Sequence, residues 1–223
     1  NLWLQYRFSM NESILRNVLF PTLRRAINFY IPFLEEDEQG ILHLKETYSP
    51  EYGSAEDCNY DIALLRWGCQ TLLKASQILS IKDDLIPKWQ EIIEKLTDYP
   101  QDENGMMIGK DVPFSKSHRH YSHLLMFYPL YLLNIEQNES KELLEKSVEH
   151  WLSIPGNILG FSNTGASSLY AAAGEGDKAL EKLKGLFALT LRPNTMYMES
   201  GPVIETPLSG AQCIHDMLLQ SWG

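Results

Sequence analysis

Apolar residues recur along most of this chain with the three- and four-residue spacing of amphipathic helices. The first such stretch begins after Asn11, a candidate N-cap, and contains Pro21, where we expect a kink or a break. In a later stretch Pro87 falls in the first turn, where proline is tolerated. The pattern predicts helices over residues 11–34, 56–80, 83–96, 121–134, 139–153, 162–173, 177–189 and 209–221.

Strand patterns are short and few. Residues 41–44 (Ile-Leu-His-Leu) predict a short strand after an acidic turn at 35–40. Residues 98–109 contain Asn104-Gly105 before a short apolar run and predict a small hairpin. Strands and helices do not alternate in βαβ order, so we predict an all-α fold.

The connections between the predicted helices fall into two kinds. Long loops at 45–55, 110–120 and 190–207 carry most of the unusual polar residues, whereas short turns at 135–138 and 174–176 carry almost none. This difference predicts helical hairpins whose long loops gather on one face. Loops of that length in a compact domain are usually functional.

The composition is that of an ordinary globular chain with one sizeable core, since 44% of its 223 residues are hydrophobic and 22% are charged. The net charge of −10 argues against a nucleic-acid or anionic-membrane partner, because both are bound by neutralising phosphates. No run reaches the ~18 apolar residues of a membrane span. Cys58, Cys69 and Cys213 lack CxxC spacing and are predicted to be free thiols.

Half of the six histidines lie in one segment, His118-Arg119-His120-Tyr121-Ser122-His123. Burying such a cluster without partners is costly, so it predicts the wall of a polar pocket. A metal site would use the three histidines, but the sequence places no carboxylate or cysteine at ligand spacing beside them, and we expect no metal. A structural role would pair the rings with backbone groups and the arginine with an acid. In a substrate pocket, the same N–H groups would bind hydroxyls or a carboxylate.

Two glutamates in long loops are candidate catalytic groups. Glu51 lies between a proline and an aromatic-glycine pair, where a rigid, partly desolvated carboxylate would suit a general acid. Glu205 follows Glu199 in the loop before the final predicted helix, where the helix dipole favours the ionised form that a general base needs. The simpler interpretations are an exposed loop glutamate for Glu51 and a helix cap for Glu205.

Several segments, in order along the chain, resemble glycoside hydrolase family 95, the inverting α-L-fucosidases and their α-L-galactosidase relatives. The histidine segment resembles the family's His-Arg-His-x-Ser-His-Leu motif and is the most specific part of the resemblance. The other matching segments are Ser49-Pro50-Glu51, Tyr128-Pro129, Gly160-Phe161-Ser162, Gly176-Asp177 and Met217-Leu218-Leu219-Gln220-Ser221.

The resemblance implies an (α/α)6 toroid, of which residues 1–223 would form roughly the second half. An N-terminal part of the same protein would then pack against this chain. The resemblance also implies hydrolysis, with inversion, of a terminal α-L-fucoside or related bond in an oligosaccharide or glycan. It implies no cofactor and a periplasmic or secreted location.

The resemblance further implies roles for the two acids. Glu51 aligns with the family's general acid, and Glu205 aligns with the aspartate on the side of the base. The sequence departs from the family at this position. Glu205 is one methylene longer than the family's aspartate, and it is followed by Thr-Pro instead of Gly-Asn.

The sugar-contacting roles of the motif carry over to Arg119 and His120, with His118 and His123 in support. Asn59 and Asp61, near the start of the helix at 56–80, are further candidate substrate-binding residues. Asp61 falls where the family has an acid opening that helix, although an acid in a first turn is also common for its effect on the dipole.

Two rival functions remain. The changed loop at Glu205 motivates a carbohydrate-binding pseudoenzyme on the same toroid. A helical interaction scaffold without a sugar site is the second rival, and it predicts that Glu51, Arg119 and Glu205 lie far apart.

Overall fold

A computed structural model describes residues 1–137, 139–199, 201 and 203–221. This part of the chain is mostly helical, which confirms the all-α prediction, and its strands form two-stranded antiparallel hairpins. No helix in the described ranges is long and apolar enough to cross a membrane. Cys58, Cys69 and Cys213 are free and buried, as predicted.

The α-helices are α1 (Leu2–Ser9), α2 (Glu12–Ile14), α3 (Phe20–Tyr30), α4 (Asn59–Leu79), α5 (Ile86–Lys95), α6 (Ser140–Ser153), α7 (Gly160–Ala172), α8 (Gly176–Thr190) and α9 (Glu205–Leu218). A π-helical turn, η1, spans Leu15–Leu19, and 3-10 turns span Ile31–Phe33 (η2) and Ser122–Leu124 (η3). The strands pair as β1 (Leu34–Glu36) with β2 (Leu42–Leu44), β3 (Thr47–Ser49) with β4 (Gly53–Ala55), and β5 (Gln101–Asp102) with β6 (Gly105–Met106).

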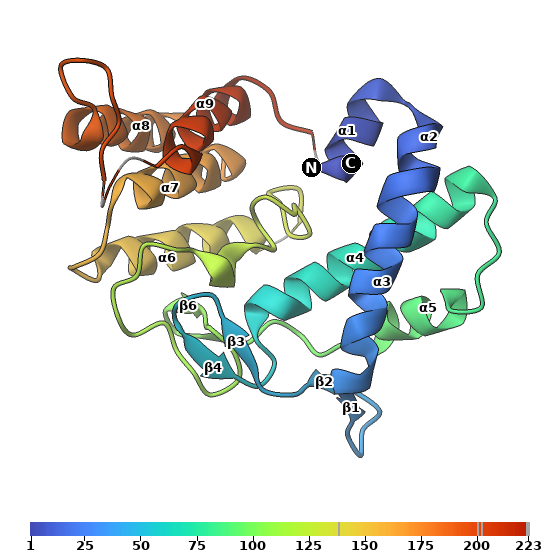
Figure 1. Cartoon of the computed structure of the whole chain (residues 1–223). Coiled ribbons are helices and arrows are strands. Elements are labelled where there is room, and N and C mark those ends of the chain that lie inside the picture. Colours follow the sequence, from blue (N-terminus) through green and yellow to red (C-terminus); the bar gives the residue numbers. More distant parts are fainter. Residues whose placement is uncertain (138, 200, 202, 222–223) are drawn as a thin grey trace.

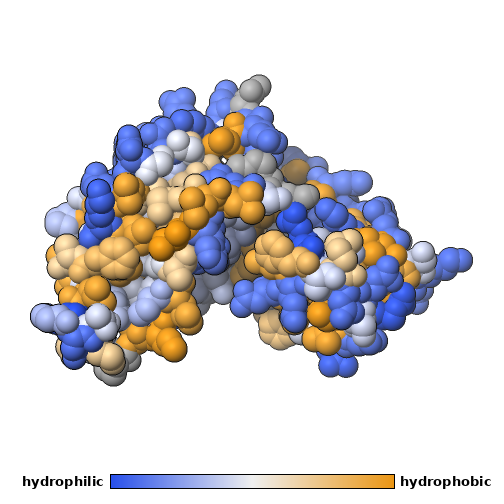
Figure 2. All heavy atoms as spheres, turned by 90° about the horizontal axis from the view of Figure 1, so that it is seen from above, coloured by the Kyte–Doolittle hydropathy of each residue, from blue (hydrophilic) through white to orange (hydrophobic). Residues whose placement is uncertain are grey.

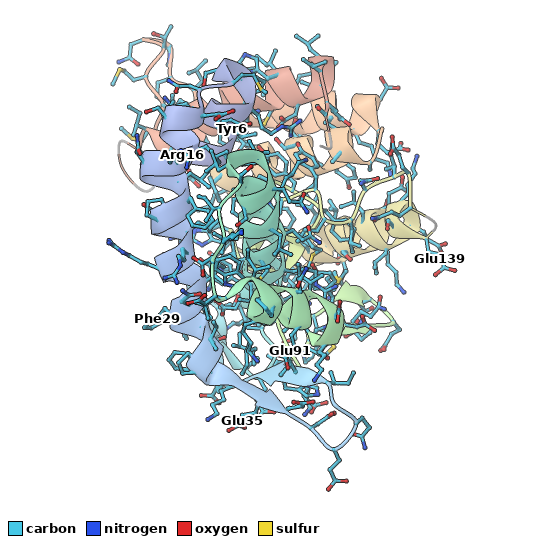
Figure 3. All side chains as sticks on the ribbon, turned by 90° about the vertical axis from the view of Figure 1, so that its right-hand side faces the viewer. Tyr6, Arg16, Phe29, Glu35, Glu91 and Glu139 are labelled. Atoms are coloured by element: carbon cyan, nitrogen blue, oxygen red, sulfur yellow. The ribbon has the colours of Figure 1, made fainter. Side chains whose placement is uncertain are left out.

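One lobe is built from α1 to α5 around the long helix α4, which packs against α3 and α5 (Figure 1). Its core is mostly aliphatic and includes Tyr6, Phe20 and Trp89, whose indole N–H donates to Asn28 at 3.2 Å. Figure 3 views this lobe from the side of α3, where Phe29 is 65% exposed.

The other lobe is built around α7, which packs against both α8 and α9 (Figure 1). Helix α7 is buried along almost its whole length, and its many Gly, Ala and Ser residues allow neighbours to approach closely. Its buried hydroxyls have partners: Ser167 donates to the Ala179 carbonyl and Ser168 to Asp216, at 2.8 and 2.7 Å. A buried polar group without a partner would destabilise this lobe.

At Pro21, where a kink or a break is predicted, a π-helical turn interrupts the regular α-helix. The π-helical turn η1 immediately precedes it, and Pro21 lies in the first turn of α3. A π turn inserts an extra residue into the hydrogen-bond ladder of the helix. Proline has no N–H to donate, and here it falls where the regular α-helical hydrogen bonds are already interrupted. The chain therefore continues through this point as joined helical segments.

The predicted helix over 121–134 is wrong. Only η3 is helical there, and a series of turns follows it. Pro129 offers no N–H for a helix, and Tyr131 has a φ of +50°. The apolar run still enters the core, where Leu124, Met126 and Phe127 are almost fully buried.

The loop predicted at 45–55 contains an unexpected hairpin, β3–β4, and the acidic turn at 35–40 lies within a second, β1–β2. The strand at 41–44 and the hairpin at 98–109 are confirmed as β2 and β5–β6. The β3–β4 hairpin matters most, because its tip carries Glu51.

A hollow separates the two lobes in the view of Figure 2, and apolar side chains gather on the lobe that contains α8 and α9. The exposed side chains on these helices and their connecting loop include Phe187, Leu189, Met196, Ile204 and Leu208.

Candidate active site

Glu51 stands at the tip of the β3–β4 hairpin. Ser49 pairs with Gly53 across the two strands, and the Tyr52 amide donates to the Ser49 carbonyl at 3.0 Å to close the turn. The backbone of Glu51 has a φ of +57°, in the left-handed region that residues other than glycine seldom adopt. Such a conformation persists only when the surroundings hold it, and at functional sites it serves to aim a side chain.

Tyr52 holds the hairpin tip in place. Its hydroxyl accepts hydrogen bonds from the amides of Ser115 and Lys116, at 2.7 and 3.1 Å. The Lys116 ammonium donates to the Tyr52 carbonyl at 2.7 Å and lies over its ring. The polar loop at 110–120 therefore clamps the residue next to Glu51.

The histidine segment is anchored through its backbone. The buried Trp151 indole donates to the His118 carbonyl at 2.8 Å, and the Ser162 hydroxyl donates to the Arg119 carbonyl at 3.0 Å. The hydroxyls of Ser49 and Ser122, both buried, lie 2.8 Å apart and join the hairpin to this segment. These contacts fix the backbone from which the polar side chains project.

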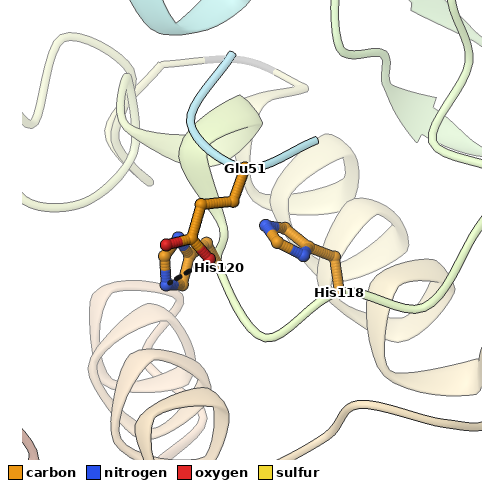
Figure 4. A group of neighbouring side chains, drawn as sticks. All are labelled: Glu51, His118 and His120. Carbon is orange, nitrogen blue, oxygen red and sulfur yellow. Dashed lines mark ion pairs between the residues drawn. The ribbon is translucent and has the colours of Figure 1, made fainter. Parts of the chain in front are cut away.

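Glu51 meets the histidine segment directly (Figure 4). Its Oε2 lies 2.5 Å from a guanidinium nitrogen of Arg119 and 3.8 Å from Nε2 of His120. His118 Nε2 lies 3.3 Å from the carbonyl oxygen of Pro50, beside Glu51. The Glu51 side chain is 53% exposed, so the predicted desolvation of this carboxylate is not found. A bound substrate would have to provide that shielding.

Burial favours the neutral form of all three motif histidines. Burial lowers the pKa of His118 and of His120, with Glu51 opposing the shift in both cases. Burial lowers the pKa of His123 further, to about 3. A neutral imidazole both donates and accepts, which suits binding to sugar hydroxyls.

A hollow of about 490 Å³ opens beside Glu51. It is lined by Glu51, Arg119, His120, Phe161, Glu199, Val203, Glu205 and Thr206. The hairpin and the histidine segment form one wall. The loop before α9 and the start of α9 form the other, which carries Glu199 and Glu205. The interaction scaffold predicts these groups far apart, and the shared hollow contradicts it.

Glu199 is a second carboxylate on the far wall. Its Oε2 accepts hydrogen bonds from the hydroxyls of Tyr197 and Thr206, and its Oε1 is buried without a partner among the described residues. Glu205, six residues later, is exposed in the first turn of α9. The sequence places Glu199 in the predicted loop at 190–207, but no pattern there predicts a role for it.

Four of the predicted site residues do not line the hollow: His118, whose contacts are described above, and Asn59, Asp61 and His123. Asn59 is fully buried and donates to the carbonyls of Pro100 and Met107, both at 2.8 Å. Asp61 is buried and accepts from Tyr30 and Thr47, at 2.8 and 2.7 Å.

His123 is also buried, and its ring stacks on Phe114 at a centroid distance of 4.4 Å. The structure gives these three side chains supporting positions, and their contact with substrate stays a prediction.

Phe161 belongs to the segment Gly160-Phe161-Ser162, which resembles the family but carries no predicted role. It opens α7 and presents its ring to the hollow, where it meets His120 edge-on at 5.6 Å. The resemblance of Gly160-Phe161-Ser162 to the family was the available signal for this lining residue. Aromatic faces pack well against the apolar faces of sugars.

The profile of the glycosyl hydrolase family 95 catalytic domain matches residues 1–218. The chain belongs to this family. Among curated proteins, none matches the chain. Membership assigns residues 1–218 to a glycoside hydrolase catalytic domain, and the helical content of the described residues is consistent with an all-α toroid.

Proposed function

We propose that this chain carries the active site of an inverting glycoside hydrolase that releases a terminal sugar, an α-L-fucoside or a related residue, from a glycan. The observation that supports this proposal is the shared hollow, with Glu51 on one wall and Glu205 on the other. Inverting hydrolysis needs two carboxyl groups on opposite sides of the bond, about 6.5–9.5 Å apart, with water beside one of them. An N-terminal part of the toroid and an extracytoplasmic location stay predictions.

Glu51 is the proposed general acid. The left-handed backbone at the hairpin tip aims its carboxyl group into the hollow, where it would protonate the leaving oxygen. In the absence of substrate its partner is Arg119. A sugar hydroxyl that takes the guanidinium would free the Glu51 carboxylate to take up a proton from solvent, which Glu51 would then pass to the leaving oxygen.

Glu205 is the proposed general base, and the sugar lies between the two acids. Glu205 would take a proton from water as the water attacks the anomeric carbon on the face opposite the leaving group. Arg119 and the neutral His120 would donate to ring hydroxyls, and Phe161 would pack on an apolar sugar face. His118 and His123 would support the wall.

Replacing Glu51 with Gln tests the acid. The variant Glu51→Gln should lower turnover about 10²–10⁴-fold on glycosides with poor leaving groups. It should change little on activated aryl glycosides, whose leaving groups need no proton. Steady-state kinetics on both substrate types measures the difference. Glu56→Gln is the matched control, because Glu56 is 62% exposed and, among the described residues, its carboxylate forms an ion pair with Lys110 alone, at 3.5 Å. Equal losses on both substrate types would contradict the role of Glu51.

A carbohydrate-binding pseudoenzyme is the second candidate. The exposure of Glu205 and the Thr206-Pro207 pair that follows it favour this alternative. It predicts micromolar sugar binding with no product after days of incubation. Release of sugar with inverted configuration, seen by NMR, would exclude it.

A further inference from the structure

We propose that Glu51, His118 and His120 form a binding site for a divalent transition metal ion of the Zn²⁺ type, and that the bound ion inhibits the enzyme. One ring nitrogen of each histidine and one carboxylate oxygen of Glu51 all lie within 4.8 Å of one another. Figure 4 shows the three side chains converging from the hairpin tip and the histidine segment. The inhibition, though not the binding, rests on the proposed function of Glu51.

The ligand set is one that zinc accepts. Two imidazoles and one carboxylate, with a fourth position open to water, are a common set of protein ligands for this ion. Zinc bonds of ~2.0–2.2 Å require ligand atoms roughly 3.4 Å apart in a tetrahedral site. The 3.8 Å between His120 Nε2 and Glu51 Oε2 is already close to that separation. Small side-chain rotations would complete the site.

The two rings are already positioned by their neighbours. The His118 ring contacts the Pro50 carbonyl and meets Tyr52 edge-on at 5.7 Å. The His120 ring meets His118 at 5.0 Å and Phe161 at 5.6 Å. Since little side-chain freedom remains to be lost, binding of an ion would carry a small entropic cost.

Arg119 is the competitor for the ion. Its guanidinium lies 2.5 Å from the same carboxylate oxygen that faces His120, and like charge repels a metal cation. An ion must therefore displace Arg119 from Glu51. This arrangement predicts that removing the guanidinium strengthens binding, whereas removing a ligand weakens it.

The bound ion would occupy the electron pair with which Glu51 holds its proton. Glu51 could then no longer protonate a leaving group, and the ion would also fill the end of the hollow that the sugar needs. Inhibition should therefore be competitive with substrate and reversed by a chelator.

Zinc titration of the whole chain, freed of metal by a chelator, tests the site. Isothermal calorimetry should find one ion per chain. His118→Gln and His120→Gln should each weaken binding by at least about tenfold, and Arg119→Gln should strengthen it. His215→Gln is the control, because His215 is exposed on α9 and away from the hollow. Circular dichroism identifies any variant that does not fold, and Co²⁺ absorption of the parent protein then reports the coordination independently.

The outcomes separate this proposal from the proposed function. Zinc binding that needs His118 and His120, in a chain without glycosidase activity, would support the site and contradict the function. An active enzyme whose zinc affinity is unchanged in both histidine variants would support the function and overturn the site. Co²⁺ spectra that show only octahedral, water-like coordination would overturn it as well.

Discussion

The two walls of the hollow are built differently. The wall of Glu51, Arg119 and His120 is tied to the protein by buried hydrogen bonds from Trp151 and Ser162. On the opposite wall, Glu205 lies exposed at the start of α9. The anchored wall carries the histidine segment on which the resemblance to the family is most specific, whereas the exposed wall carries the Glu205 loop, where the resemblance is weakest. Under the proposed function, sugar binding falls to the firmly held wall and water activation to the exposed wall.

The strongest test of the difference between the two walls removes the carboxylates of the exposed wall. If Glu205 is the base, Glu205→Gln should lower turnover about 10²–10⁴-fold on every substrate, because attack by water is needed whatever the leaving group. Glu199→Gln should cost less, since hydroxyls of Tyr197 and Thr206 already occupy one Glu199 oxygen. Kinetics with an activated aryl glycoside measures both variants.

The reverse order of losses would assign the base to Glu199. The exposed wall would then hold its catalytic carboxylate, Glu199, as firmly as the anchored wall holds Glu51. Equal and small losses for both variants would favour the pseudoenzyme, provided that sugar binding persists.

The second test loosens the anchored wall. Gly165 on α7 lies against the ring of Tyr121, and a Cβ there would fall 2.1 Å from a ring carbon. Gly165→Ala should therefore lower the free energy of unfolding by about 1–3 kcal/mol, as overpacking of a core does. It should also shift the neighbouring histidines and weaken sugar binding. Chemical denaturation and a sugar titration measure the two effects.

Gly176→Ala is the matched control for this substitution. It lies at the start of α8, nothing stands within 4 Å of the added Cβ, and the residue is exposed. Alanine should leave the free energy of unfolding unchanged or raise it slightly, because it reduces the conformational entropy of the unfolded chain. A loss at Gly176 as large as that at Gly165 would show that the contact with Tyr121 is not the cause.

The difference between the walls also explains how much the sequence predicted. The helices predicted over 56–80, 83–96, 139–153, 162–173 and 177–189 correspond to α4 to α8. The histidine motif predicted the anchored wall. The convergence of Glu51 with His118 and His120 depends on the β3–β4 hairpin, which carries no strong strand pattern in Thr47 to Ala55. That pairing is a tertiary effect, and sequence spacing alone left the histidines without a carboxylate.

The supporting places of Asn59 and Asp61 could not be predicted for a similar reason. A polar residue at a helix start looks the same in sequence whether it faces a ligand or a buried carbonyl. In the structure the partners come from distant segments, such as Pro100 for Asn59 and Tyr30 for Asp61. Only the folded chain shows which distant groups each side chain contacts.

The smallest expected effect concerns the link between the hairpin and the histidine segment, the buried hydroxyls of Ser49 and Ser122 at 2.8 Å. Either single change, Ser49→Ala or Ser122→Ala, leaves one hydroxyl without its partner and should cost about 1–3 kcal/mol. The double variant should cost less than the sum of the two, with a coupling of about 1 kcal/mol. Denaturation of all four proteins measures this cycle. Strict additivity would mean that the two segments are held independently, and the anchoring of Glu51 would then rest on the Tyr52 clamp.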